Sequence, residues 1–242
     1  MPRAAREKSQ SETYHIMLRG INQQQIFEDE QDYQKFIEII KTYQAICEYK
    51  IFAYCLMGNH IHLLMEFKKE PIEQVFKRIG SKYVYWYNVK YQRKGHLFQD
   101  RFKSEPVNDE QYYLTVLRYI LQNPENALIC KTKDYKWSSI GAYDHKSFVK
   151  TEFALSLFSC KKDLISFLFE KNSDECMDLQ LTREEKETKD SIVIRYIIGK
   201  QDLKSLSIPK RNFYINCMKK NGISIRRISK VTGLSIGMIQ RA

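Results

Sequence analysis

Two histidines separated by one residue are the first candidates for chemistry in this sequence. His60-Ile61-His62 directly follows Gly58-Asn59, a dipeptide typical of two-residue β-hairpin turns. Alternate side chains of a strand point to the same face, which puts the two imidazoles on one side with Cβ atoms roughly 6–7 Å apart. At that spacing they can share one metal ion. Since such pairs also occur by chance on surface strands, the pair needs partners from elsewhere in the chain.

Tyr119 and Asn123 are the candidate partners. They stand four residues apart in a predicted helix, and therefore project from the same helix face. A phenol with an ordinary pKa of about 10 is a weak nucleophile, but a divalent cation that polarises a phosphate makes its attack feasible. The amide oxygen of Asn123 can be a third ligand; this mixed set suits Mg²⁺ or Mn²⁺, although two imidazoles also accept Zn²⁺. The alternative for Tyr119 is a core aromatic ring beside Ile120.

The predicted elements bring these residues to one sheet. Hydrophobic periodicity predicts helices over 32–49 and 71–91 and strands over 14–19, 51–57, 60–67 and 97–107. A third helix begins after Asn108, with Gln111 in the capping-box position, and Pro124 is expected to stop it. The order β-α-β-β-α-β is the split βαβ, ferredoxin-like arrangement, in which two helices cover one face of an antiparallel sheet. The fold class is therefore α+β.

Composition narrows the class of partner. The 242 residues carry 40 Lys and Arg against 29 Asp and Glu, a net charge of +11, which favours nucleic acid over a membrane surface. No run approaches the ~18–20 apolar residues of a membrane span, and the first residues lack the apolar centre of a signal peptide. The six cysteines form no C-x-x-C pair, as in reduced proteins of the cytoplasm. We expect a cytoplasmic protein without a membrane partner.

Basic residues concentrate in two blocks. Residues 68–103 carry ten basic side chains against three acidic ones, and residues 201–242 carry nine against one, whereas 151–200 are slightly acidic. In the first block, Tyr and Trp residues alternate with lysines, a pattern that suits phosphate contact combined with base stacking on single strands. Two basic blocks separated by an acidic spacer indicate two nucleic-acid contacts. The alternative is that these lysines only keep helix faces solvated.

The second basic block has the pattern of a helix-turn-helix. A helix over 210–220 ends at Asn221-Gly222, Ser224 caps the next helix, and Ser235 caps the last one after a turn at Gly233. Short helical hairpins also occur without any DNA role, but the basic residues here favour DNA binding. In the last helix, Ser235, Gln240 and Arg241 are candidate contacts to bases or phosphates.

Four ordered motifs resemble the single-tyrosine HUH transposases, the IS200-like family, and within it the branch associated with REP elements. The motifs are RGIN at 19–22, MGNHIHLL at 57–64, LFQDRFKS at 97–104 and LRYILQNP at 117–124. The resemblance covers about residues 11–143. It implies an HUH-type domain over 1–146, followed by a helical linker region over 147–200, with helices at about 152–170 and 183–198, and a helix-turn-helix DNA-binding region over 201–242.

The resemblance also implies an activity. The metal ligands would be His60, His62 and Asn123, with Gln122 as a competing candidate for the third position. Tyr119 would attack a phosphodiester of single-stranded DNA near a hairpin, forming a covalent 5′-phosphotyrosine and releasing a 3′-hydroxyl. The partners are then single-stranded or hairpin DNA and flanking duplex, bound by a monomer or a homodimer.

Two other functions remain as alternatives. One is a catalytically inert, domesticated DNA-binding regulator, and the other is an RNA-processing nuclease that does not need the tyrosine. We expect His15 and His96 to be structural or surface residues rather than ligands. The expected DNA-binding residues are Arg19, Asn22, Lys82, Arg101, Lys103, Arg226, Arg227, Ser235, Gln240 and Arg241.

Overall fold

The structure is a computed structural model that describes residues 6–171, 174, 176, 194, 197–198, 202–220 and 222–242. It divides the chain into two units, Met1–Met177 and Asp178–Ala242, which are described one at a time. The helix expected over 183–198 lies outside the described residues, apart from Ile194, Ile197 and Ile198, which are helical. In the described part of the chain, no helix is both long and apolar enough to cross a membrane.

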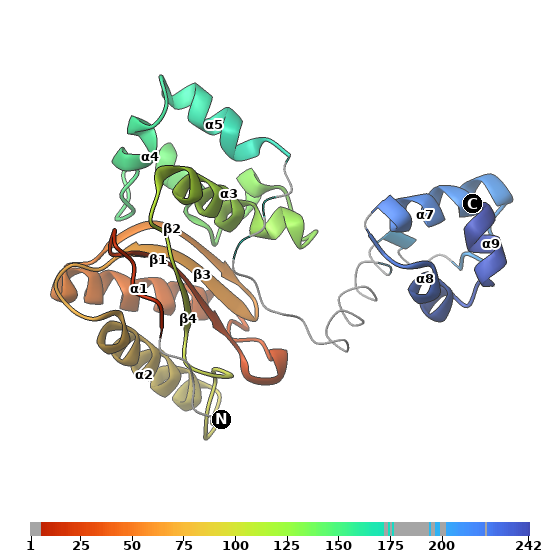
Figure 1. Cartoon of the computed structure of the whole chain (residues 1–242). Helices are drawn as coiled ribbons and strands as arrows, with labels where there is room; N and C mark the ends of the chain where they lie inside the picture. Colours follow the sequence, from red (N-terminus) through yellow and green to blue (C-terminus); the bar gives the residue numbers. More distant parts are fainter. Residues whose placement is uncertain are drawn as a thin grey trace. The chain divides into compact units, whose positions relative to one another are not determined.

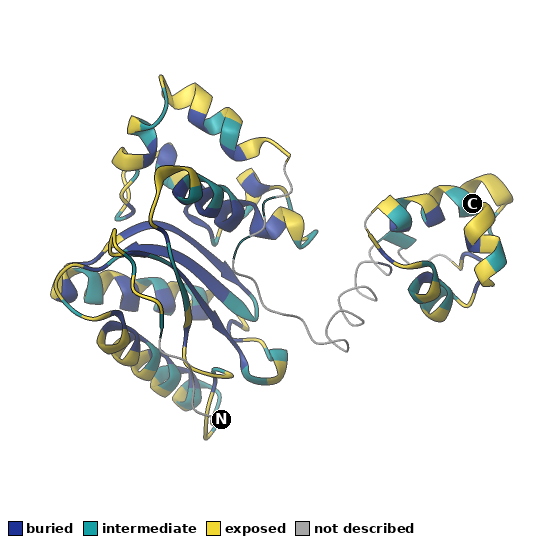
Figure 2. Ribbon diagram, in the orientation of Figure 1, coloured by how far each residue is buried: buried dark blue, intermediate teal, exposed yellow. Residues whose placement is uncertain are grey.

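A four-stranded antiparallel sheet forms the centre of the first unit (Figure 1). The strands lie in the order β2-β3-β1-β4, which is the order of the predicted split βαβ arrangement. Their bounds are β1 (Thr13–Arg19), β2 (Lys50–Met57), β3 (His60–Glu66) and β4 (Lys103–Pro106). β1, β2 and β3 are buried along most of their length, whereas the residues of β4 are exposed or half-buried (Figure 2).

The fourth strand is shorter than the expected 97–107. Before β4, the segment pairs with the end of β1 only at an isolated bridge between Gly20 and Phe98. The Asp100 side chain then accepts a hydrogen bond from the backbone N–H of Arg101 at 2.7 Å. Such local bonds of Asp compete with ladder formation. Arg101, which we expected to alternate with Lys103 on a strand, therefore lies in a bend before it.

Side-chain alternation in β3 separates two apolar cores. Ile61, Leu63 and Met65 belong to the core beneath α1 (Glu30–Cys47) and α2 (Ile72–Lys90), as the sequence predicts. Leu64 belongs to a second core, formed against α3 (Glu110–Asn126) on the opposite face. The sheet is thus sandwiched between the α1–α2 layer and α3 (Figure 1). The histidine face of β3 is the face that α3 covers.

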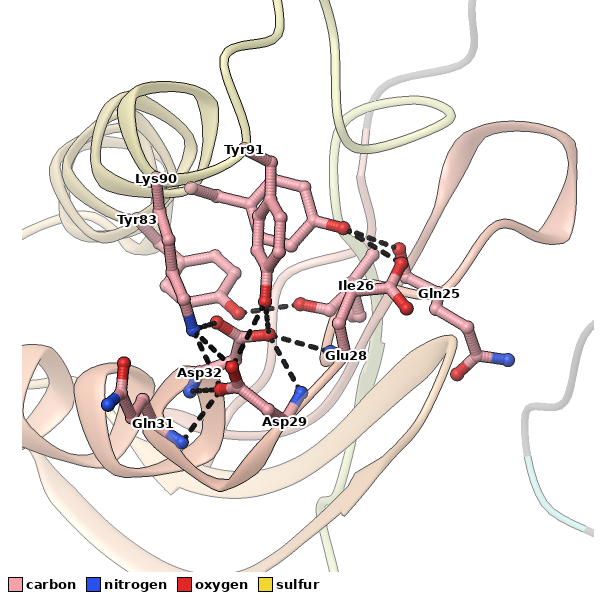
Figure 3. Close-up of polar contacts among 10 residues, drawn as sticks. Gln25, Ile26, Glu28, Asp29, Gln31, Asp32, Tyr83, Lys90 and Tyr91 are labelled. Carbon is pink, nitrogen blue, oxygen red and sulfur yellow. Dashed lines mark hydrogen bonds and ion pairs between the residues drawn. The ribbon is translucent and has the colours of Figure 1, made fainter.

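The segment between β1 and α1 is tied to α2 by a polar network (Figure 3). Asp29 caps α1, earlier than the expected start at Asp32, because the two carboxylates form a reciprocal capping box. Asp32 is fully buried, and it accepts hydrogen bonds from Lys90 at 2.8 Å and from Tyr91 at 2.9 Å. A carboxylate so deeply buried is tolerated only with partners of this kind.

The same segment contacts the β2–β3 turn that precedes His60. The backbone N–H groups of Ile26 and Phe27 both donate to the carbonyl of Gly58, at 2.8 and 3.1 Å. Tyr83 of α2 donates its hydroxyl to the carbonyl of Ile26 at 2.6 Å. The first turn after β1, η1 (Ile21–Gln23), is joined to the same place, since the side-chain amide of Asn59 donates to the carbonyl of Gln23. The α2 network therefore supports the turn that positions the first histidine.

Both ends of α3 differ from the prediction. Asp109, rather than Asn108, caps the helix, since its side chain accepts from the backbone N–H of Tyr112 at 2.7 Å. Asn108 instead accepts from Ser9 and Gln10 in the N-terminal segment.

Pro124 does not stop α3, which continues to Asn126. The residues from Leu121 to Pro124 are buried, and the backbone N–H of Ala127 still donates to the carbonyl of Asn123. A proline this near the end of a helix removes one hydrogen bond, toward Ile120, and the packing of the buried turn that contains Pro124 outweighs that loss. Asn123 consequently stays helical and on the same face as Tyr119.

The first unit extends past residue 146, where we expected it to end. The expected helix over 152–170 is two helices, α4 (Glu152–Ser156) and α5 (Lys161–Phe169), interrupted where the Ser156 hydroxyl bonds back to the carbonyl of Phe153. Leu164 and Leu168 of α5 are fully buried in the core shared with α3. Two further turns, η2 (Thr132–Asp134) and η3 (Ser139–Tyr143), connect α3 to this layer.

The second unit contains three described helices around its own apolar core. They are α7 (Ile208–Lys220), α8 (Ile225–Thr232) and α9 (Ile236–Arg241). Ser224 and Ser235 cap α8 and α9, and Gly233 adopts a left-handed conformation with φ of 69° at the end of α8. These are the caps and the turn that the sequence predicts. The buried residues of this core include Ile215, Met218, Ile228, Leu234 and Ile239.

Candidate active site

The two histidines of β3 lie beneath α3 with their rings close together. Their ring centroids are 5.1 Å apart, and the ring planes are nearly perpendicular at 88°. His62 is fully buried, whereas His60, next to the turn, is half-buried. The structure thus places both imidazoles on one face of the sheet, as the strand alternation predicts.

His60 lies between two side-chain amides. Its Nδ1 is 2.7 Å from Oδ1 of Asn59, and its Nε2 is 3.2 Å from Oδ1 of Asn123. An amide oxygen only accepts hydrogen bonds, so either contact can take the ring proton, and the shorter contact, with Asn59, favours the tautomer with the proton on Nδ1. In that tautomer a lone pair on Nε2 faces the oxygen of Asn123. Two acceptors at this separation have the arrangement of two ligands of one cation.

His62 presents an unused ring nitrogen at the same place. Its Nδ1 is 3.0 Å from Nε2 of His15, and its buried Nε2 has no hydrogen-bond partner among the described residues. Burial lowers the pKa of His62 well below its ordinary value, and the neighbouring His60 and His15 lower it further. His62 is therefore neutral at neutral pH, and neutral imidazole is the form that binds metals.

Tyr119 brings the phenol to this pair of rings. Its ring centroid is 5.7 Å from that of His62 and 6.0 Å from that of His15. The other two tyrosines of α3 have different surroundings. Tyr113 packs in the core against Phe52, and its hydroxyl is buried without a hydrogen-bond partner among the described residues. Burial and a hydrogen bond to Glu105 raise the pKa of Tyr112.

The structure separates the two candidate amides. Asn123 faces His60, one helical turn after Tyr119. Gln122 points toward α5 instead, and its amide nitrogen donates to the carbonyls of Leu168 and Glu170 at 2.7 and 2.9 Å. Of the two, Asn123 alone has its side-chain oxygen at an imidazole.

The candidate donor atoms are Nε2 of His60, Nε2 of His62 and Oδ1 of Asn123. They fit a divalent cation, since one of them is a buried nitrogen without a hydrogen-bond partner within the described chain and the other two already face each other. No three His, Cys, Asp or Glu side chains of the described residues gather as a metal site. A cation at this place therefore depends on the amide as its third protein ligand. Two nitrogens and one oxygen, all neutral, accept Mg²⁺, Mn²⁺ or Zn²⁺.

The expected DNA contacts of the first unit are spread over several elements. Arg19 is buried at the end of β1, directly opposite His60 in the ladder. Asn22 is exposed in η1 with φ of 50°, Arg101 is exposed in the bend before β4, and Lys103 is exposed on β4. Lys82 is exposed on α2, which covers the opposite face of the sheet. Lys82 is therefore not brought to the histidine face.

The expected DNA contacts of the second unit lie on α8 and α9. Arg226, Gln240 and Arg241 are exposed, and Arg227 is half-buried. The hydroxyl of Ser235 accepts from the backbone N–H of Met238, so it already acts as a helix cap.

The sequence did not predict the contacts that support His60 and His62 on the side away from the proposed cation. Asn59 holds His60, His15 holds His62, and Glu105 lies 3.7 Å from the outer nitrogen of His15. We expected His15 and His96 to be structural or surface residues; His15 is fully buried and His96 is exposed. The split βαβ order pairs β1 with β3, which puts His15 beside the histidine strand, but the residue register of that pairing could not be deduced from the chain alone.

Comparisons with known proteins show a family to which the first unit is similar. The family model described as "Transposase IS200 like" matches residues 8–123, which include the four strands and α3 up to Asn123. Over residues 8–123, this chain therefore matches the IS200-like transposase family.

A solved structure is similar over a larger part of the chain. It is described as "Structure of the REP associates tyrosine transposase bound to a REP hairpin", with a TM-score of 0.55, and the match covers 74% of this chain and 96% of that one. At 14% sequence identity, the likeness establishes the fold. No curated protein matches this chain.

Proposed function

We propose that this chain is a metal-dependent endonuclease and strand transferase for single-stranded DNA. As a transposase, it would nick DNA next to hairpins through a covalent 5′-phosphotyrosine on Tyr119. The observation that carries the proposal is the meeting of four groups from two elements. The Tyr119 ring lies 5.7 Å from the His62 ring, and Asn123, one turn later, contacts His60.

In this proposal His60, His62 and Asn123 hold Mg²⁺ or Mn²⁺. A cation held by these residues would supply Lewis-acid chemistry to the scissile phosphate, whose developing charge it would stabilise. Because all three ligands are neutral, they leave the full positive charge of the cation to act on the phosphate. Three protein ligands also leave coordination positions for phosphate oxygens, as a catalytic site requires.

Tyr119 acts as the nucleophile. Its phenolic oxygen bonds to phosphorus, the bond from phosphorus to the 3′ oxygen breaks, the phenol loses its proton and the departing oxygen gains one. One ester replaces another, so the bond energy is kept in the protein–DNA link and no nucleotide cofactor is needed. A 3′-hydroxyl can later attack the phosphotyrosine and rejoin strands. The packed position of the ring on α3 restricts the phenol to one approach, which lowers the entropic cost of attack.

The proposed substrate is single-stranded DNA beside a hairpin. Exposed Arg101 and Lys103 lie on the segment that borders β1 and suit contacts with phosphates. The solved relative is described as bound to a REP hairpin, which supports the same class of substrate here. The second unit, with exposed Arg226 and Arg241, would bind flanking duplex through its helix-turn-helix.

Covalent trapping tests the proposal. The full chain is incubated with Mn²⁺ and a pool of DNA hairpins whose single-stranded flanks are randomised. The label is at the 3′ end, because a 5′-phosphotyrosine retains the 3′ fragment. We expect a labelled adduct that resists denaturation, is absent with EDTA and is lost in Tyr119→Phe.

Tyr113→Phe is the matched control, since it removes a phenolic hydroxyl from the same helix, and that hydroxyl has no hydrogen-bond partner among the described residues. This variant should form the adduct like the wild type. An adduct on Tyr119→Phe would refute the nucleophile. Duplex binding that survives EDTA, with no strand cleaved, would favour the inert regulator, and RNA cleavage by Tyr119→Phe would favour the RNA nuclease.

A further inference from the structure

A third histidine, His15, is buried next to the proposed ligands and has no part in the reaction described above. It lies on β1, the strand between β3 and β4, where its Cα partners are Leu64 and Glu105. Its side chain is fully buried. The ring stacks on that of His62, with centroids 5.3 Å apart. A buried imidazole in such a place needs partners for both of its nitrogens.

The two nitrogens of His15 face different groups. Nε2 is 3.0 Å from Nδ1 of His62. Nδ1 is 3.7 Å from Oε2 of Glu105, within ion-pair range but too far for a hydrogen bond, and it has no hydrogen-bond partner among the described residues. Glu105 also forms a hydrogen bond with the hydroxyl of Tyr112 on α3, which helps to fix the carboxylate. The groups form a row from Glu105 through His15 to His62, which ends at the unused Nε2 of His62.

The row can hold its protons in two ways. A carboxylate favours a proton on the nearer nitrogen of His15, which makes Nε2 of His15 an acceptor. The proton shared between the rings then belongs to Nδ1 of His62, and Nε2 of His62 keeps its lone pair. In the opposite arrangement Nε2 of His62 would carry a proton in a buried position where no described residue accepts it, and the lone pair of Nδ1 of His15 would face the Glu105 carboxylate. Both ends of the row favour the first arrangement.

We propose that His15, oriented by Glu105, is a positioning residue that fixes the tautomer and the ring orientation of His62. It keeps the lone pair of Nε2 of His62 directed at the cation site, as Asn59 does for His60. Metal-bound histidines commonly donate their other nitrogen to such a partner, and losing the partner weakens metal binding by about 10–100-fold. The inference rests on the proposed metal site.

The first test does not involve metal. The full chain, labelled with ¹⁵N-histidine and free of metal, is studied by two-bond ¹H–¹⁵N NMR correlation, which distinguishes the tautomers of His62. We expect His62 to carry its proton on Nδ1 in the wild type. His15→Gln should preserve this tautomer, since the Gln side-chain oxygen can take the place of Nε2 as acceptor. His15→Leu should lose it.

The second test measures Mn²⁺ affinity of the same proteins by EPR titration. His15→Leu should bind about 10–100-fold more weakly, whereas His15→Gln should stay close to the wild type. His145→Leu is the matched control, because His145 is exposed and distant in sequence from the site. Circular dichroism and thermal melting establish that each variant folds. If His15→Leu does not fold, Glu105→Gln carries the test, with loss of the Nδ1–H tautomer and weaker Mn²⁺ binding expected.

A His62→Ala variant separates this inference from the proposed function. If His62→Ala binds Mn²⁺ as the wild type does, the metal site itself is wrong. If His62→Ala loses Mn²⁺ but the folded His15→Leu binds normally, only the role of His15 is refuted. A wild-type His62 with its proton on Nε2 would refute that role as well.

Discussion

At the scale of single residues, the third ligand position is the clearest contrast in the site. Asn123 and Gln122 are neighbours with the same functional group, yet one faces His60 and the other binds two carbonyls at the end of α5. A helix rotates about 100° per residue, so adjacent side chains cannot serve the same neighbour. Of two consecutive amides, Asn123 is thus the proposed metal ligand, and Gln122 supports the end of α5.

This division gives a prediction. Asn123→Ala should weaken Mn²⁺ binding and abolish the covalent adduct, with little change in the free energy of unfolding. Gln122→Ala should leave Mn²⁺ affinity unchanged but lower the free energy of unfolding by about 1–3 kcal/mol, because two carbonyls lose their donor. Mn²⁺ titration and urea denaturation of both variants measure the two effects. The reverse result, with Gln122→Ala as the variant that loses metal, would refute the assignment.

The side chains proposed to do chemistry were predictable because each pair is close in sequence. His60 and His62 share a strand, and Tyr119 and Asn123 share a helix, so regular geometry relates the members of each pair. The residues that support them were not predictable in the same way. Asn59 adjoins His60, but its contact depends on the turn, and His15 reaches His62 only through strand register, which no local pattern specifies.

At the scale of elements, the turn before His60 is built against the segment that follows β1. Two glycines, Gly20 and Gly58, meet there under different constraints. A Cβ on Gly20 would come within 2.3 Å of the backbone oxygen of Gln24, whereas a Cβ on Gly58 would come within 2.2 Å of the side-chain oxygen of Gln25. The packed backbone at Gln24 cannot move aside for a Cβ on Gly20, whereas the exposed side chain of Gln25 can move aside for a Cβ on Gly58.

We therefore expect Gly20→Ala to be much more damaging than Gly58→Ala. Gly20→Ala should lower the free energy of unfolding by about 1–3 kcal/mol, as overpacking does, and should also weaken Mn²⁺ binding by displacing the turn at His60. Gly58→Ala should change both quantities little. Urea denaturation and Mn²⁺ titration of the two variants check this, and equal effects would show that the loop yields as easily as the side chain.

The elements themselves were largely predictable, and their ends were not. The order and type of strands and helices in the first unit follow from periodicity and turn residues. Asp109 rather than Asn108 caps α3, and the helix passes through Pro124, because tertiary contacts decide between neighbouring caps and tolerate one lost hydrogen bond.

At the scale of the whole molecule, the chain has two units with separate apolar cores. The first holds the histidine site, and the second carries exposed basic residues on short helices. We expected the first to end at residue 146, but α5 packs on α3 and extends it. The apolar periodicity of a helix such as α5 predicts that one face is buried, but it does not predict which element covers that face.

The DNA-binding roles proposed for the two units predict separable activities. Arg226→Ala/Arg241→Ala should weaken duplex binding and reduce the salt dependence of log K by about 2, one for each phosphate contact. The same variant should still form the covalent adduct with a free hairpin. Lys146→Ala/Lys162→Ala removes equal charge from exposed positions of the first unit and is the control. Loss of adduct formation together with duplex binding would contradict the separation.

The contribution of α3 has a consequence for how the site can be switched off. The two imidazoles belong to strand β3 of the sheet, whereas the Tyr119 phenol and the Asn123 amide both belong to α3. A shift of that helix as a single body would remove the proposed nucleophile and the proposed third metal ligand in the same movement. In the proposed mechanism, the complete set of three metal ligands would therefore not be present without the phenol beside it.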